Sequence, residues 1–185
     1  KAHSIEMAID PDEFSAMVST YSSSGEKEWI AADVTIDGTT YADSAIRLKG
    51  NSTLRGVSTD DDPATLPWMV KLDKTVEQDH DGLTEFVIRG SSSKTSLNEA
   101  VALELLSAAG LASQDAAAIS LTVNGSEPVL RLVIDNPEDE WMSEVLSDSG
   151  ALYKAEADGD YSYRGSDSSA YEEAFDQEAG KDNAD

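Results

Sequence analysis

The sequence lacks cysteine, has only two histidines, and contains no long apolar run. Without cysteine there can be no disulfide, no thiolate zinc site and no cysteine nucleophile. With only His3 and His80, we expect neither a multi-histidine metal site nor a histidine-based catalytic triad. No apolar stretch of about 18 residues occurs, so we expect no membrane span. The chain begins at Lys1 rather than Met, and we expect that it was shortened at its front.

Basic residues are also scarce, with 13 Lys and Arg against 37 Asp and Glu and a net charge of −24. Such a surface repels nucleic acid and anionic membranes. Seven of the 13 basic residues nevertheless fall in one stretch: Arg47, Lys49, Arg55, Lys71, Lys74, Arg89 and Lys94. This clustering indicates either a local anion site or ordinary salt-bridge partners for the many carboxylates.

The first half of the chain reads as mostly antiparallel strands. Alternating or apolar runs predict strands at residues 3–9, 29–36, 39–49, 68–72 and 84–89. Asp37-Gly38 predicts a tight hairpin turn. Asp10 is a suitable N-cap for a helix that starts at Pro11. Its expected apolar stripe consists of Phe14, Met17, Val18 and Tyr21.

The second half contains the clearest helix, from Leu97 to Ala109, with Ser96 as N-cap and Gly110 after its end. This helix is apolar almost all round, which predicts that it is buried. Strands are expected at residues 119–123, 129–134 and 151–154, and a short acidic helix at 136–146. We therefore predict an α+β fold: an antiparallel strand-rich lobe with a buried helix over residues 1–154, and a weakly structured acidic tail over 155–185.

The segment Arg47–Arg55, RLKGNSTLR, has the composition of a phosphate cradle. Gly50 permits close approach of a ligand to the backbone, and Asn51, Ser52 and Thr53 add short hydrogen-bonding side chains. Lys49 and Arg55 place positive charge on either side. An ordinary turn also accounts for Gly-Asn-Ser, so the residues alone leave both interpretations open.

Glu99 and Lys71 form a second candidate pair. Glu99 shares a helical face with apolar residues, so it is expected to point inward and to need a partner. That partner is either the Ser96 cap or a lysine from the preceding sheet, such as Lys71. A strand lysine paired with a helix glutamate holds the ATP phosphates in protein kinases.

Two acidic loops, residues 79–82 and 158–160, resemble calcium ligands in composition. Neither has the spacing and closing glutamate of a complete calcium loop. Solvated acidic loops are the favoured interpretation, with calcium-dependent adhesion as the weaker alternative.

The order of motifs resembles the spore coat protein H (CotH) kinase family, in particular its acidic Gram-positive forms. The resemblance spans nearly the whole chain. Its matching pieces are Val34–Gly38, Arg47–Ser52, Leu66–Trp68, Lys71–Asp73, Leu97 with Glu99–Ala102, Ala109–Ala112, Val123–Gly125, Ala151–Lys154, Asp160–Tyr161, Tyr163–Gly165, Tyr171 and Phe175. The RLKGNS and Leu-Tyr-Lys pieces are the most specific.

This resemblance implies an atypical kinase-like fold that transfers phosphate from ATP, with Mg²⁺, to a protein. The implied nucleotide-site residues are Lys49, Asn51, Ser52, Arg55, Lys71, Glu99 and Asp135. Lys71 is implied as the phosphate-binding lysine, with Lys49 as its rival and Glu99 as the helix partner. The resemblance places Asp135 near the hinge beside the adenine, at a position where the family usually has Glu. Val129 and Arg131 replace the family's usual Gly and Tyr, so the chain departs from the family pattern at this hinge.

The family's second half, with its catalytic and metal-binding Asp residues, is not represented in these 185 residues. Because phosphoryl transfer depends on Mg²⁺ held by such carboxylates, we expect this chain to be inactive by itself. The family also implies a secreted or cell-surface location, such as a spore coat, and a protein substrate or coat partner. The alternative function is a non-catalytic coat or surface scaffold.

Overall fold

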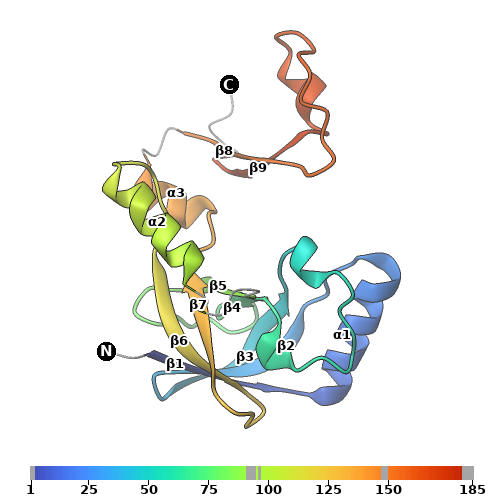
Figure 1. Ribbon diagram of the computed structural model, residues 1–185, viewed down its shortest axis with the longest axis vertical. Coiled ribbons are helices and arrows are strands. Elements are labelled where there is room, and N and C mark those ends of the chain that lie inside the picture. The colour runs from blue at the N-terminus through green and yellow to red at the C-terminus, as the bar shows by residue number, and fades with distance from the viewer. Residues whose placement is uncertain (1–2, 91–94, 96, 147–149, 181–185) are drawn as a thin grey trace.

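The computed structural model describes residues 3–90, 95, 97–146 and 150–180, and its main body is a closed seven-stranded barrel (Figure 1). The strand order around the barrel is β1-β2-β3-β4-β5-β7-β6. The strands are β1 (His3–Ile9), β2 (Ile30–Ile36), β3 (Thr39–Leu48), β4 (Trp68–Lys71), β5 (Glu85–Arg89), β6 (Ala116–Val123) and β7 (Val129–Ile134). The prediction of a strand-rich α+β fold is confirmed, and each predicted barrel strand is present within a few residues.

Local turn chemistry sets the hairpin registers. Asp37 and Gly38 have φ values of 48° and 90°, which suit a type I′ turn, and Ile36 pairs with Thr39 across it. Asn124 and Gly125 also have positive φ values, and the backbone N–H of Ser126 donates to the carbonyl of Val123 across them, but the last strand pair of this hairpin is Leu121 with Val129. The barrel is closed by a pairing that the sequence did not predict: β1 runs parallel to β6.

The main core fills the barrel interior and extends to the first helix, α1 (Pro11–Ser24). Alternate residues of each strand point inward, as Ile5, Met7 and Ile9 of β1 do. In α1, Phe14, Met17 and Val18 are buried and Tyr21 packs against the same core, as predicted. The Asp10 side chain accepts hydrogen bonds from the backbone N–H groups of residues 12 and 13, which confirms the N-cap.

A smaller apolar cluster lies on the outer surface of β4, β5 and β7. It contains Met69, Val87, Leu132 and Ile134. Helix α2 (Asn98–Ala108) contacts this cluster through Ala100 and Leu103. This outer surface, rather than the barrel interior, positions the candidate site.

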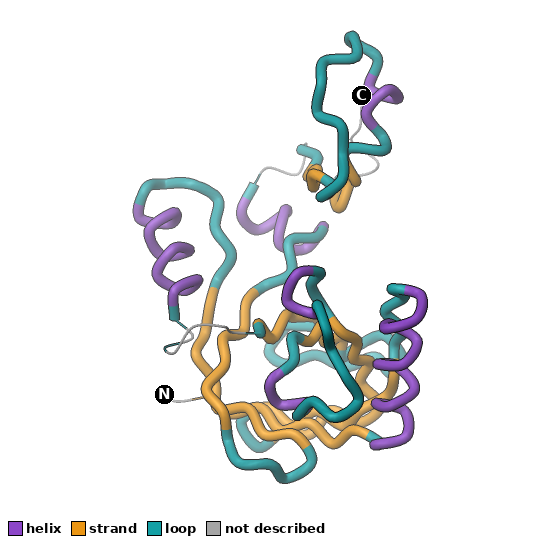
Figure 2. The backbone as a smooth tube through the Cα atoms, turned by 45° about the vertical axis from the view of Figure 1, so that its right-hand side comes forward, coloured by secondary structure: helices purple, strands orange, loops and turns teal. Residues whose placement is uncertain are grey.

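The prediction that the second helix is buried was wrong. None of the 11 residues of α2 is buried, and Val101 and Leu105 expose 68 % and 70 % of their surface. The helix rests on the barrel along one edge only, so most of its apolar circumference faces outward (Figure 2). Its predicted N-cap, Ser96, lies outside the described residues.

The chain after the barrel contains α3 (Asp139–Val145) and a two-stranded sheet of β8 (Leu152–Ala155) and β9 (Phe175–Ala179). The backbone N–H of Gly180 donates to Asp139 Oδ1 at 2.7 Å, which links this sheet to α3. The tail predicted to be weakly structured contains the strand β9 and the short helix η3 (Ser168–Tyr171). Two further short helices, η1 (Ser52–Leu54) and η2 (Pro63–Thr65), lie between β3 and β4. No helix within the described residues has the length and apolarity needed to cross a bilayer.

Candidate functional site

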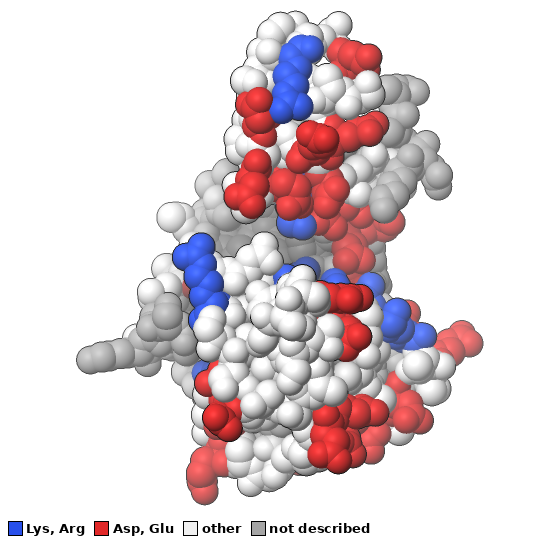
Figure 3. Space-filling model, turned by 90° about the vertical axis from the view of Figure 1, so that its right-hand side faces the viewer, with Lys and Arg blue, Asp and Glu red and all other residues white. Residues whose placement is uncertain are grey.

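A cleft of about 470 Å³ lies between the outer barrel surface, α2 and the β8–β9 sheet. On the face shown in Figure 3, several basic side chains lie along the hollow between the barrel and the β8–β9 part, and acidic side chains form separate patches on the β8–β9 part and on the barrel. The charged residues that line the cleft are Lys49, Arg89, Glu99, Lys154 and Glu178. This is the place where a strongly acidic chain concentrates positive charge.

An ion pair between a strand and a helix forms one wall of the cleft. Arg89, the last residue of β5, donates from Nε to Glu99 Oε2 in the first turn of α2 at 2.8 Å. Both side chains stay partly exposed, so the pair remains accessible to a ligand. The predicted Lys71–Glu99 pair was wrong, because Arg89 takes the place of the lysine. Arg89 was not predicted as a site residue from the sequence. The signal that could have identified it is its position at the end of the predicted strand that precedes this helix.

Lys49 enters the cleft from the end of β3. Its backbone N–H donates to the carbonyl of Pro67 at 3.0 Å, and its Nζ donates to Asn136 Oδ1 at 3.3 Å. Burial lowers the pKa of Lys49, and the nearby charges of Arg47 and Lys154 lower it further. Its side-chain hydrogen-bond partner is a neutral amide, so a bound anion would relieve this crowding of positive charge.

Lys71 lies in a different environment on β4. Its ammonium forms ion pairs with Glu85 and, at 3.5 Å, with Glu138. Burial lowers the pKa of Lys71, but the hydrogen bond and charge of Glu85, with a contribution from Glu138, outweigh burial and raise it. Asn136 joins the two lysine environments, since its Nδ2 donates to Glu85 Oε1 at 2.9 Å. Two carboxylates thus already neutralise Lys71, and it does not line the cleft.

Other basic side chains lie near Lys49. The Arg47 guanidinium lies 4.7 Å from the centre of the Trp29 ring, and its buried Nε has no hydrogen-bond partner within the described chain. Burial, followed by the charges of Arg47, Lys49 and Lys154, lowers the pKa of Lys27. Lys27 and Lys154 were not predicted as site residues. Lys154 stands in the Leu-Tyr-Lys piece of the resemblance, which was the only signal for it.

The predicted phosphate cradle is only partly assembled. Gly50 has a φ of 103°, a left-handed conformation that favours glycine, and Asn51 Oδ1 accepts a hydrogen bond from Lys27 Nζ at 2.8 Å. Ser52 and Arg55 are exposed and do not line the cleft. The structure therefore brings Lys49 and Glu99 together in the cleft, whereas Asn51 does not line it.

Asp135 is separated from this group. It lines a neighbouring groove, where its Oδ2 accepts a hydrogen bond from the backbone N–H of Asp115 at 2.7 Å. Burial raises the pKa of Asp135, and the charges of Asp115 and Glu144 act in the same direction. It does not line the cleft that holds Lys49 and Glu99.

Across the described residues, no group of three or more His, Asp or Glu side chains has the geometry to hold a metal ion. In the acidic loop at residues 79–82, the Asp79 carboxylate accepts a hydrogen bond from the backbone N–H of Gly82 at 2.7 Å. No protein-family model and no curated protein matches the chain.

Proposed function

We propose that the cleft binds the phosphate groups of a nucleotide, and that the chain is the nucleotide-binding part of a CotH-like protein kinase. The observation that carries this proposal is the Arg89–Glu99 pair at 2.8 Å, which joins a strand cation to a helix carboxylate beside Lys49. Protein kinases use the same pairing, with lysine in the strand, to hold the α- and β-phosphates of ATP.

Lys49, rather than Lys71, is the proposed phosphate contact. A phosphate requires a cation that is not already neutralised, and Lys49 has an amide partner where Lys71 has two carboxylates. Lys154 adds a second ammonium to the cleft, although its hydrogen bond to Glu178 at 2.6 Å offsets part of its charge.

The residues present fit an anionic ligand better than a metal. Burial first, and then the charges of Arg47 and Lys154, lowers the pKa of Lys49, which lines the cleft. The described residues supply no metal-binding group, so we assign no residue to Mg²⁺.

Nucleotide binding tests this function directly. Isothermal titration calorimetry of ATP with the purified chain should show measurable binding. Lys49→Gln should weaken it about tenfold or more, because a charge-assisted hydrogen bond contributes about 1.5–3 kcal/mol.

Arg55→Gln is the matched control, since it removes one positive charge from an exposed residue outside the cleft. Its affinity for ATP should stay within about twofold of the parent chain. Equal losses in both variants would mean that binding depends on general charge, and it would refute the cleft assignment. Absence of ATP binding to the folded parent chain would favour the alternative, a non-catalytic coat or surface binding domain.

A further inference from the structure

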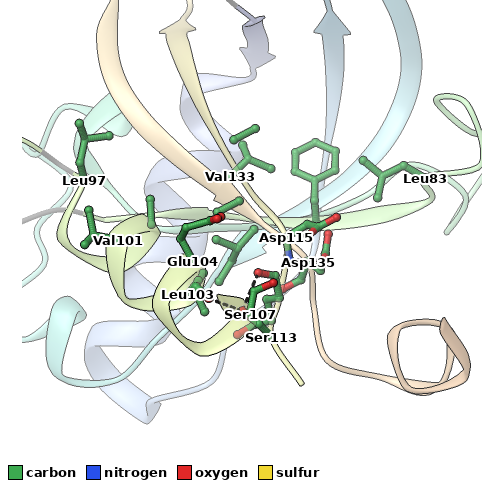
Figure 4. A pocket seen from close by; sticks show the side chains of 16 residues that line it. Leu83, Leu97, Val101, Leu103, Glu104, Ser107, Ser113, Asp115, Val133 and Asp135 are labelled. Atoms are coloured by element: carbon green, nitrogen blue, oxygen red, sulfur yellow. Dashed lines mark hydrogen bonds between the residues drawn. The ribbon is translucent and has the colours of Figure 1, made fainter. Parts of the chain in front are cut away.

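A second concavity beside α2 adjoins the basic cleft and shares Leu103, Ser113, Gln114 and Ile134 with it. It is a groove of about 830 Å³ between α2 and the adjoining ends of β6 and β7. In Figure 4, Leu97 and Val101 project from the helix and Val133 from the facing strand, with Leu83 at the far side. These side chains give the groove an apolar floor and one apolar wall.

The apolar surface continues beyond the groove along α2. Leu105 and Leu111 expose 70 % and 58 % of their surface, although both belong to an almost wholly apolar segment. Eleven helical residues span about 16 Å, which is longer than a small ligand and fits a short polypeptide segment. Contiguous exposed apolar surface of this kind marks an interaction site.

Carboxylates line the same groove. Glu104, Asp115 and Asp135 project toward it from the helix and from the strand ends (Figure 4). An adjoining cavity of about 360 Å³ shares Leu83 and Asp135 with the groove and adds Asp81, Glu85 and Glu144. Among the described residues that line these two cavities, none is Lys or Arg.

The carboxylates that line the groove and the adjoining cavity, called the rim below, carry like charges close together. The raised pKa of Asp135 arises first from burial and then from the charges of Asp115 and Glu144. A positively charged group at the rim would relieve this repulsion. Glu85 is already paired with Lys71, so the unpaired negative charge lies with the residues nearer the groove.

We propose that the groove beside α2 binds an amphipathic polypeptide segment of a partner protein, one that carries leucine-like side chains on one face and Lys or Arg on the other. Its apolar face packs against Val101, Leu97 and Val133, and its cations meet Glu104, Asp115 and Asp135. Helix-in-groove recognition has this pattern of apolar anchors at helical spacing. A second copy of this chain is a poor occupant, because it would bring a net charge of −24 to an acidic rim.

A synthetic helical peptide of leucine and lysine, about 18 residues long with leucine every three or four positions, provides the probe. Fluorescence anisotropy of the labelled peptide with the whole chain should show saturable, micromolar binding. Raising NaCl from about 50 mM to about 500 mM should weaken binding at least about threefold, because salt screens the contacts of the rim. The same peptide with glutamate in place of lysine should not bind.

Two variants locate the site. Val101→Lys places a cation inside the groove and should weaken peptide binding by about tenfold or more. Leu130→Lys makes a comparable change at an exposed leucine of β7 that does not line the groove, and its affinity should stay within about threefold. A second pair of variants repeats the comparison for the charge at the rim. Glu104→Lys changes a residue that lines the groove and should weaken binding, whereas Glu127→Lys makes the same change in the distant β6–β7 hairpin and should not.

Several results would overturn the proposal. They are no peptide binding to the folded chain, equal losses in Val101→Lys and Leu130→Lys, or tighter binding of the glutamate peptide. Self-association in sedimentation experiments that Val101→Lys abolishes would assign the groove to a second copy instead. Binding to vesicles of anionic lipid that is lost in Val101→Lys would assign it to a membrane surface.

Discussion

Lys49 and Lys71 lie at the ends of two neighbouring strands, β3 and β4, yet their surroundings shift their pKa values in opposite directions. Lys71 is held between Glu85 and Glu138, and its pKa is raised, whereas Lys49 contacts Asn136 and its pKa is lowered. A lysine that carboxylates already neutralise has little attraction left for phosphate. This difference is why we propose Lys49 as the phosphate contact.

Asp135 permits a prediction of pH dependence at the residue scale. Its pKa in the folded chain is raised above the ordinary value of 3.8, with burial as the first cause. A carboxyl with a raised folded pKa contributes stability below 3.8, and that contribution is lost as the pH rises through the folded pKa. Asp135→Asn should therefore raise the melting temperature at pH 7 and leave it nearly unchanged near pH 3.

The Asn side chain retains an oxygen that can accept the hydrogen bond from the backbone N–H of Asp115. Thermal melts of both proteins at several pH values would test this prediction. A lower melting temperature for the variant at pH 7 would mean that the charge of Asp135 stabilises the fold, contrary to the expected sign.

At the scale of the element, α2 combines a strongly apolar sequence with a surface position. Contact with the outer barrel cluster comes through Ala100 and Leu103, and the Arg89–Glu99 pair fastens its first turn. Because one edge of the helix makes these contacts, its leucines contribute different amounts to the free energy of unfolding.

Two identical substitutions in α2 should therefore have different effects. Leu103→Ala removes a side chain packed against the Met69 and Val87 cluster and should lower the free energy of unfolding by at least about 1 kcal/mol. Leu105→Ala removes a side chain that is 70 % exposed and should change it by no more than about 0.5 kcal/mol. Urea denaturation followed by circular dichroism measures both changes.

Helix propensity does not distinguish the two variants, since both replace leucine with alanine within one helix. Equal destabilisation by the two substitutions would contradict the surface position of α2. It would instead support the fully buried helix that its composition predicts.

For the whole molecule, the net charge of −24 is the dominant electrostatic property. Self-repulsion among like charges destabilises the compact state, and added salt screens it. The melting temperature at pH 7 should therefore rise when NaCl is increased from about 20 mM to about 300 mM.

The effect of salt should nearly vanish close to the isoelectric point of about 4.1, where the net charge approaches zero. Differential scanning calorimetry at both pH values provides the comparison. A fall in melting temperature with salt at pH 7 would mean that attractive ion pairs, such as those of Lys71 and Lys154, outweigh the repulsion.

The outer surface of the barrel carries both proposed binding surfaces. Its cluster of Met69, Val87, Leu132 and Ile134 packs against α2, and the basic cleft and the acidic groove adjoin each other beside this helix. The charged residues proposed to contact the nucleotide differ from those proposed to contact the peptide. Variants of these charged residues therefore test the two proposals separately.

The sequence by itself determined the features that depend on neighbouring residues. Period-two alternation and apolar runs predicted the barrel strands, Asp37-Gly38 marked a hairpin, and Asp10 marked the start of α1. These features follow from backbone preference and local hydrogen bonding, which a short segment already contains.

Only the tertiary structure decided which distant groups meet. The parallel pairing of β1 with β6, the choice of Arg89 rather than Lys71 as partner of Glu99, and the exposure of α2 all depend on residues far apart in the chain. Composition shows how apolar a helix is, but the area of sheet available to cover it follows from how the barrel closes. For the same reason, Lys154 joins Lys49 at one cleft although nothing in its local sequence requires it.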